Sequence, residues 1–516
     1  MKHTSGQLKK VLAYILAILL LAGGIFLAVC FIRFGIRIKP WEETGETEET
    51  AAAEETPRPE EGDGREPEEA GEWDSPAENR PAAGEIFSGK KEETGENACG
   101  EEETQTPETY EPPDLMLASD LHYLSPSAHD DGSAFRKMVA ADDGKPSQYS
   151  EEMTDALLAE AVRARPSALI LSGDLTHNGE RQGHLELADK LRRVQEAGVP
   201  VLVIPGNHDI KNPMAAVYFG DEKQAAENLD SGEEFYEIYR EFGYDGAISR
   251  DSASLSYVYV LDDTHWVMML DSCQYEDKNH VGGRIREETL AWMEEQLSLA
   301  AEKEISVLPV AHHNLLSESR LYKTECTLEN GGQVTELLEK YEIPLYVSGH
   351  LHAQRIKKHR EEPGAEDHVY GVTEIVLGPY SIPPCQYGYL RWDEENRLAF
   401  ETREADVASL AAASGGGDEI LLQFDQKGTE LVRQTIRDQL SKTRFAVPEG
   451  AAELMKNLYA NLYVDYCAGY PIDRKSVTST RGYGMWLRAA PDSKYVKEME
   501  EMMEDASVSH RQWTQK

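Results

Sequence analysis

Five short segments of the sequence each place Asp, His or Asn directly after an apolar run. In chain order they read SDLH, SGDLT, GNHD, AHHN and SGHLH, and they begin at residues 119, 172, 206, 311 and 348. Carboxylate, imidazole and amide groups are the oxygen and nitrogen ligands that bind divalent transition metals. The spacing Asp120-x-His122 would place both side chains on one side of an extended backbone, and the same spacing recurs at His350-x-His352. The set predicts a metal site.

Each segment taken alone has a simpler interpretation. Residues 201–204 are typical of a short buried strand and residues 205–206 of a turn, with Asn207 or Asp209 as the cap of the next element. Only the recurrence of the pattern after five apolar runs favours the metal site.

The apolar runs read as strands that would position these side chains. They lie at 115–118, 169–171, 201–204, 266–270, 305–310 and 345–347, and helical patterns at 151–164, 184–197 and 287–301 separate several of them. This alternation predicts an α/β domain with a largely parallel or mixed sheet. Ligands of such sheets bind outside the carboxyl ends of the strands, where the five segments would lie. Closing strands are expected at 372–377, 388–392 and 398–401, followed by helices at 419–439, 451–463 and 493–503.

The ordered set D-x-H, G-D, G-N-H-D, H and G-H-x-H resembles the calcineurin-like metallophosphoesterase superfamily. The resemblance covers residues 114–403 and implies an α/β fold, a four-layer α/β/β/α sandwich. Carried over by position, it implies one metal ion held by Asp120, His122, Asp174 and His352, and a second held by Asp174, Asn207, His312 and His350. Asp174 would bridge the ions, whereas His208 would bind no metal and face the substrate as a catalytic acid or hydrogen-bond donor.

One position departs from the family pattern. Many members have Pro after the histidines of the fourth motif, where this chain has Asn314. Alignment with the preceding strand favours His312 over His313 as the ligand. The remaining histidines, among them His177, are interpreted as surface or core residues.

Longer stretches narrow the resemblance. SDLHYLSPSAHDDG, DDGKPS, SGDLTHNGE and PGNHDIKNP are similar to a bacterial branch described as cyclic-nucleotide phosphodiesterases, which has a helical C-terminal domain. This implies metal-dependent hydrolysis of a small phosphoester by two divalent or mixed-valence transition metal ions (Mn, Fe or Zn). Tyr123, Lys145 and Asn178 are candidates for the substrate cleft, with packing inside loops as the competing interpretation.

Two other functions fit the same motifs. One is an extracytoplasmic phosphatase or phosphodiesterase that acts on nucleotides or cell-envelope phosphoesters. The other is a metal-bound interaction module with little turnover. The complete ligand set together with His208 favours an enzyme, since a binding module has no evident need for all eight positions.

The N-terminal residues 1–39 predict a membrane anchor. Residues 11–32, VLAYILAILLLAGGIFLAVCFI, carry no charge and are long enough to span a bilayer once. A cleaved signal peptide, or a lipoprotein modified at Cys30, is the alternative. Basic residues flank the segment on both sides, so the positive-inside rule is nearly balanced. A short leading tail with three lysines favours a single-pass protein with its catalytic domain outside the cell membrane.

Composition sets the remaining expectations. The formal net charge of -42 argues against binding of a nucleic-acid duplex, and much of the acidic excess lies in residues 40–113. That segment is rich in Gly, Pro and Thr, so it is expected to be a disordered linker. The 516 residues are therefore expected to form the membrane anchor at 1–39, the linker at 40–113, a catalytic domain at 114–403 and a helical C-terminal domain at 404–516. The scattered cysteines predict neither a zinc knuckle nor a disulfide framework, and nothing indicates an oligomeric state.

Overall fold

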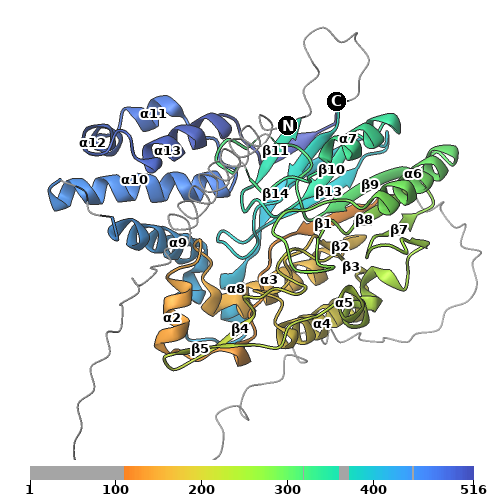
Figure 1. Cartoon of the computed structure of the whole chain (residues 1–516), viewed down its shortest axis with the longest axis horizontal. Coiled ribbons are helices and arrows are strands. Elements are labelled where there is room, and N and C mark those ends of the chain that lie inside the picture. The colour runs from red at the N-terminus through yellow and green to blue at the C-terminus, as the bar shows by residue number, and fades with distance from the viewer. Residues whose placement is uncertain are drawn as a thin grey trace, which may run out of the picture. The chain divides into compact units, whose positions relative to one another are not determined.

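The fold is described from a computed structural model, in which residues 110–515 are placed apart from 318, 323, 359–370, 444 and 446 (Figure 1). These residues belong to one compact unit. The predicted anchor and almost all of the predicted acidic linker lie outside the described residues. Within the part of the chain that is described, no helix is both long and apolar enough to cross a bilayer.

Two β-sheets form the centre of the fold. The first has the order β15-β14-β13-β1-β2-β3 and the second β11-β12-β10-β9-β8-β7-β6, while β4 and β5 form a separate hairpin. The strands are β1 (Asp114–Ala118), β2 (Ala168–Leu171), β3 (Val201–Val203), β4 (Ala216–Phe219), β5 (Glu222–Ala225), β6 (Ser249–Arg250), β7 (Tyr257–Asp262), β8 (His265–Leu270), β9 (Ser306–Ala311), β10 (Leu345–Ser348), β11 (Arg355–Lys358), β12 (Thr373–Val376), β13 (Gln386–Trp392), β14 (Leu398–Glu404) and β15 (Gln512–Thr514).

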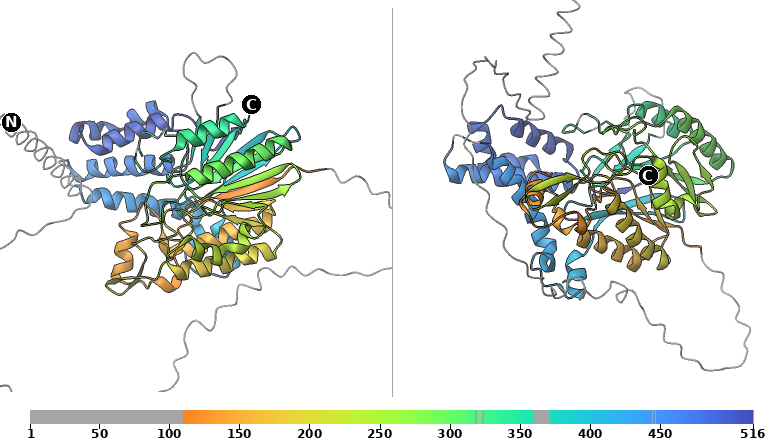
Figure 2. Two further views of the ribbon diagram at one scale, coloured as in Figure 1. Left: turned by 45° about the vertical axis from the view of Figure 1, so that its right-hand side comes forward. Right: turned by 60° about the horizontal axis from the view of Figure 1, so that its bottom comes forward.

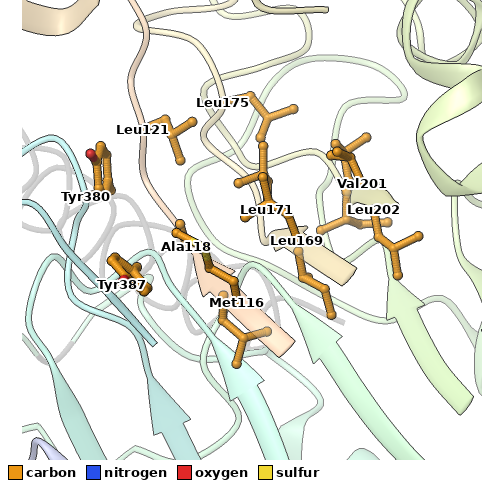
Figure 3. Packing of buried hydrophobic residues seen from close by; sticks show 14 of the residues in the cluster. Met116, Ala118, Leu121, Leu169, Leu171, Leu175, Val201, Leu202, Tyr380 and Tyr387 are labelled. Carbon is orange, nitrogen blue, oxygen red and sulfur yellow. The ribbon is translucent and has the colours of Figure 1, made fainter. Parts of the chain in front are cut away.

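Both sheets are mixed. In the first, β1, β2 and β3 run parallel and β13, β14 and β15 pair antiparallel. In the second, β8, β9, β10 and β12 run parallel. Met116, Leu169 and Val201 are cross-strand neighbours on β1, β2 and β3, and Figure 3 shows their apolar side chains in the core. The mixed α/β fold predicted from the sequence is confirmed.

The two faces of the second sheet pack in two different apolar clusters. Val267 and Met269 of β8 belong to the large cluster that also contains the strands of the first sheet. Trp266 and Met268 point the other way and pack with α6 (Glu287–Glu302) and α7 (Gly331–Lys340). Helices α3 (Ser150–Ala164) and α4 (Arg181–Glu196) cover the other side of the first sheet, so helices lie outside both sheets (Figure 2).

The C-terminal region is helical, as predicted, and both of its ends join the first sheet. It runs from β14 through helices to β15, which pairs with β14. Its helices are α8 (Val407–Ala413), α9 (Phe424–Ser441), α10 (Glu449–Cys467), α11 (Arg474–Thr478), α12 (Arg481–Ala489) and α13 (Lys494–Asp505). Among the described residues, two further α-helices are α2 (Ser133–Val139) and α5 (Gly232–Tyr239).

The helical region shares an apolar cluster with the second sheet. Trp486 is fully buried at its centre, and Leu351 and Ala353 belong to the same cluster. These two residues alternate with His350 and His352, the predicted ligands of the fifth motif. The C-terminal helices therefore support the backbone that carries two candidate ligands.

Candidate metal centre and active site

The predicted ligands come from the ends of five strands. Asp120 and His122 follow β1, and Asp174 follows β2. Asn207 follows β3, and His312 comes directly after β9. His350 and His352 follow β10. Because parallel strands of one sheet end at the same edge, these segments meet where the carboxyl ends of both sheets lie together.

Two groups of ligand atoms result, and Asp174 belongs to both. In each group the candidate atoms lie within 4.8 Å of one another. The first consists of Asp120, His122, Asp174 and His352, and the second of Asp174, His312 and His350. Asn207 joins the second group, since its Oδ1 lies 3.2 Å from His312 Nε2. The structure thus brings all seven predicted ligands together.

The spacing of these atoms fits metal ions. His122 Nε2 and His352 Nε2 lie 3.0 Å apart. Zinc-to-nitrogen bonds are about 2.0–2.1 Å, so two imidazoles at right angles on one ion would hold their nitrogens roughly 3 Å apart. His312 Nε2 lies 3.3 Å from Asp174 Oδ2, and His122 Nε2 lies 3.8 Å from the same oxygen. One carboxylate oxygen therefore faces imidazoles of both groups.

His313 is turned away from this centre. Its Nδ1 lies 2.8 Å from Ser272 Oγ and its Nε2 lies 2.9 Å from the carbonyl oxygen of Val281. Both ring nitrogens are used in these hydrogen bonds. The geometry favours His312 as the ligand of the fourth motif.

The backbone at the site differs from the extended segments expected from the D-x-H and H-x-H spacing. Five candidate ligands have a left-handed conformation, and that expectation is wrong: φ is 56° at Asp120, 44° at His122, 48° at Asp174, 66° at His350 and 54° at His352. A non-glycine residue in this region costs roughly 1–3 kcal/mol and persists only where its surroundings enforce it. These left-handed turns direct the ligand side chains toward the centre, which extended segments would not do.

Two glycines allow the strained turns to pack. A Cβ atom at Gly206 would lie 2.2 Å from Asp174 Oδ1, and one at Gly349 would lie 1.8 Å from Ser119 Oγ. Any side chain at either position would push the ligand loops apart. Backbone hydrogen bonds complete the arrangement, since the amide of Asp120 donates to the carbonyl of Gly173 at 3.1 Å.

Burial and charge together set the protonation of the ligands. Burial alone would raise the pKa of Asp174, but the surrounding imidazoles, His312 first, hold that pKa well below its usual range. Burial alone would lower the pKa of His312, yet the Asp174 carboxylate raises it to about 9. Likewise Asp143, against the effect of burial, raises the pKa of His352 to about 10. Metal binding needs neutral imidazole, so it would release protons from both histidines.

Asp143 orients one ligand and was not singled out from the sequence. Its Oδ2 accepts a hydrogen bond from His352 Nδ1 at 2.5 Å, which leaves Nε2 facing the first group. Its Oδ1 lies 2.9 Å from Lys145 Nζ, and its backbone carbonyl accepts a hydrogen bond from the Tyr463 hydroxyl of α10. A carboxylate behind a ligating histidine fixes the ring and raises its basicity. In the sequence, the only indication of this role is the pair Asp142-Asp143 at the start of the DDGKPS stretch.

The three predicted cleft residues have different positions. Tyr123 lies in the core and donates its hydroxyl to Glu186, so its assignment to the cleft is wrong. Lys145 lines a cavity beside the centre, but its buried ammonium is paired with Asp142 and Asp143. Asn178 lines the same cavity, with its Oδ1 3.1 Å from His208 Nδ1.

His208 lies between the metal ligands and that cavity. Its Nδ1 lies 2.8 Å from the carbonyl oxygen of His177, and its Nε2 lies 4.0 Å from Asp174 Oδ2. A hydrogen bond from Nδ1 to this carbonyl fixes the ring and leaves Nε2 for a ligand. About a third of the side chain is exposed (32%), in contrast to the buried Asp174.

Asp209, the last residue of GNHD, ties the second and third motifs together. Its carboxylate accepts hydrogen bonds from the backbone amides of Leu175, Thr176 and Gly206 at 2.8–3.1 Å. The sequence pattern suggested Asp209 as a cap of the element that follows, whereas its carboxylate binds amides that precede it in the chain. Asn207 and His208, by contrast, point into the site.

Asp143 yields a prediction about metal affinity. Asp143→Asn should weaken binding of Mn²⁺ by about 10–100-fold, because the orienting carboxylate behind His352 is lost. Asp142→Asn is the matched control, since it removes the same charge one residue away, from a carboxylate that pairs with Lys145 and has no described contact with a candidate ligand. Calorimetric titration of the metal-free proteins measures both affinities. Equal affinities in the two variants would contradict the positioning role.

Comparison with known proteins places this geometry in a family. Residues 114–354 match the family model for calcineurin-like phosphoesterases. The chain is 26% identical over 202 residues to the glycerophosphodiester phosphodiesterase GpdQ of Enterobacter lignolyticus, which covers 39% of this chain and 61% of that protein. It is 23% identical over 221 residues to the 3',5'-cyclic adenosine monophosphate phosphodiesterase CpdA of Haemophilus influenzae, with 42% and 64% covered. The matches thus span less than two thirds of either relative.

A solved structure of a dimetal phosphatase from Danio rerio is 15% identical, with a TM-score of 0.41, and covers 57% of this chain and 97% of that one. A score of this size does not establish a shared fold. The family match rests on the sequence of residues 114–354, which contains all seven gathered ligands. The chain therefore carries a calcineurin-like phosphoesterase domain over residues 114–354.

Proposed function

We propose that this protein is a dinuclear-metal phosphodiesterase that hydrolyses small phosphodiesters, with cyclic nucleotides among its substrates. The observation that carries the proposal is the shared position of Asp174 in two groups of ligand atoms, with His208 directly beside them. A binding module would need neither the second group nor the histidine.

The residues of the site would have two roles, metal binding and proton donation. Two divalent ions, when bound, would supply Lewis acidity that lowers the pKa of coordinated water and offsets charge on the phosphate. Asp120, His122 and Asn207, which are buried, would hold them in a fixed arrangement together with the partly buried His350 and His352 and the remaining ligands. In the protonated His208 ring, Nδ1 donates to the His177 carbonyl and Nε2 can donate a proton to the leaving oxygen. Oxygen and nitrogen ligands suit Mn, Fe or Zn, so the donor set does not select one metal.

Preference for diesters is supported by the two relatives, both of which are named phosphodiesterases. A diester carries one negative charge at neutral pH and needs no further cationic cluster. Lys145, the buried lysine among the described residues that line the cavity, is already paired with two carboxylates. A monoester dianion would find no free buried ammonium there.

The substrate proposal is tested with the full-length chain and Mn²⁺. Cyclic AMP, cyclic GMP and bis(4-nitrophenyl) phosphate should be hydrolysed faster than 4-nitrophenyl phosphate. His208→Ala should lose roughly 10²–10⁴-fold in turnover, the usual contribution of a positioned proton donor, while it keeps both metal ions. Elemental analysis of the same samples reports metal content.

Each contrary result points to a different function. Fast monoester cleavage without cyclic-nucleotide turnover would favour a phosphatase for nucleotides or cell-envelope phosphoesters. Full metal content without turnover of any ester would favour an interaction module. Parallel loss of metal and turnover in His208→Ala would make His208 a ligand.

We also propose that residues 11–32 tether the protein to the cell membrane with the catalytic domain outside. The proposal rests on the uncharged apolar run and on the acidic, Gly- and Pro-rich segment that follows it. Protease added to intact cells, after any wall is removed, should release a soluble active fragment by cleavage within residues 42–111. Cleavage only after lysis would reverse the orientation.

A further inference from the structure

A cavity of about 480 Å³ opens beside His208, between α2 and the β4–β5 hairpin. Small-molecule sites are typically roughly 300–1,000 Å³ in volume. His208 and Asn178 form its wall on the side of the metal ligands. A group bound in the cavity would therefore be the part of a phosphoester nearest the proposed proton donor.

Several apolar side chains line the cavity, beside the charged side chains of Lys137, Asp142, Lys145, Asp221 and Lys223. Met138 of α2 and Met214 and Tyr218 of the hairpin region line it, together with Ala141. Tyr218 is buried, and its ring lies 6.5 Å from the ring of Phe135. Methionine and tyrosine side chains make favourable contacts with flat aromatic groups. These apolar side chains fit the face of a planar ring better than a polyol, whose hydroxyls find no hydrogen-bond partner on them.

His177 contributes a buried polar group to this cavity. His177 is 6% exposed and lines the cavity, and its Nδ1 is buried without a hydrogen-bond partner among the placed residues. Burial, helped by the positive charges of Lys145 and His208, lowers the pKa of this ring to about 3, so the imidazole is neutral. A neutral imidazole can donate and accept hydrogen bonds at the edge of a heterocycle. The lysines at the mouth, Lys137 and Lys223, are exposed.

We propose that this cavity binds the nucleoside part of the substrate, with the base against Met138, Met214 and Tyr218 and its polar edge near His177. The inference rests on the proposed phosphodiesterase function and specifies its substrate class as nucleoside phosphodiesters rather than glycerol phosphodiesters. It also gives α2 and the hairpin a role, since both line the cavity and neither carries a metal ligand.

Binding of adenosine to the metal-free full-length chain tests the cavity without any reaction. Ala141→Trp places a large side chain at an exposed position of the wall, so it should weaken adenosine binding by about tenfold or more. Ala140→Trp is the matched control, because Ala140 is exposed, adjacent and outside the lining. Titration calorimetry measures the three affinities. No adenosine binding to the wild type, or equal binding to all three proteins, would overturn the inference.

A second measurement separates the cavity from the proposed function. With Mn²⁺, Ala141→Trp should lower the ratio of kcat/KM for cyclic AMP to kcat/KM for glycerophosphoethanolamine by about tenfold, whereas Ala140→Trp should keep the wild-type ratio. An unchanged ratio in Ala141→Trp overturns the cavity assignment and leaves the proposed function standing. Adenosine binding that follows the expected order, without hydrolysis of any diester, supports the cavity and refutes the proposed function.

Discussion

The site depends on keeping one carboxylate, Asp174, charged and buried between imidazoles where the two sheets meet. An uncompensated buried charge is expensive, and breaking a buried ion pair typically costs about 3–5 kcal/mol. Here the compensation is close at hand: His312 Nε2 lies 3.3 Å from Oδ2, and the backbone amide of His208 donates to Oδ1 at 2.8 Å. The ligand loops must come together around the two carboxylate oxygens of Asp174. This explains the left-handed turns and the close approach of the Gly206 backbone to Asp174.

The C-terminal helices take part in the same arrangement. Leu351 and Ala353 place apolar side chains in the helical cluster, while His350 and His352, which alternate with them, face the centre. Tyr463 of α10 also holds the backbone of Asp143, whose carboxylate orients His352. The helical region therefore acts on the site by supporting the ligands, in addition to any contact with substrate.

The sequence predicted the centre better than its surroundings. A metal ligand must be an Asp, His or Asn side chain at the end of a strand that reaches the site. The seven ligands could therefore be assigned from five short motifs. Their left-handed backbone could not, because the D-x-H and H-x-H spacing also suits an extended strand. Tyr123 was a candidate for the cleft with packing as the competing interpretation, and its ring packs into the core.

Residues that act from separate loops escaped the sequence analysis. Asp143 and His177 lie in stretches that carry the family resemblance but have no assigned role there, and their roles depend on folding of residues 123–150 and of the β4–β5 hairpin against the site. Helix α2 and the strands of that hairpin are also too short for a clear periodic pattern. Only the tertiary contacts bring these elements to one cavity.

The bridging position of Asp174 is tested most directly by counting bound metal ions. Elemental analysis of the purified full-length chain, after exposure to Mn²⁺ and removal of the excess, gives the number of ions per chain for wild type and Asp174→Ala, with circular dichroism to show that both are folded. The account predicts two ions in the wild type and loss of most metal from the variant, because one residue serves both positions. Retention of two ions at wild-type affinity by Asp174→Ala would contradict it.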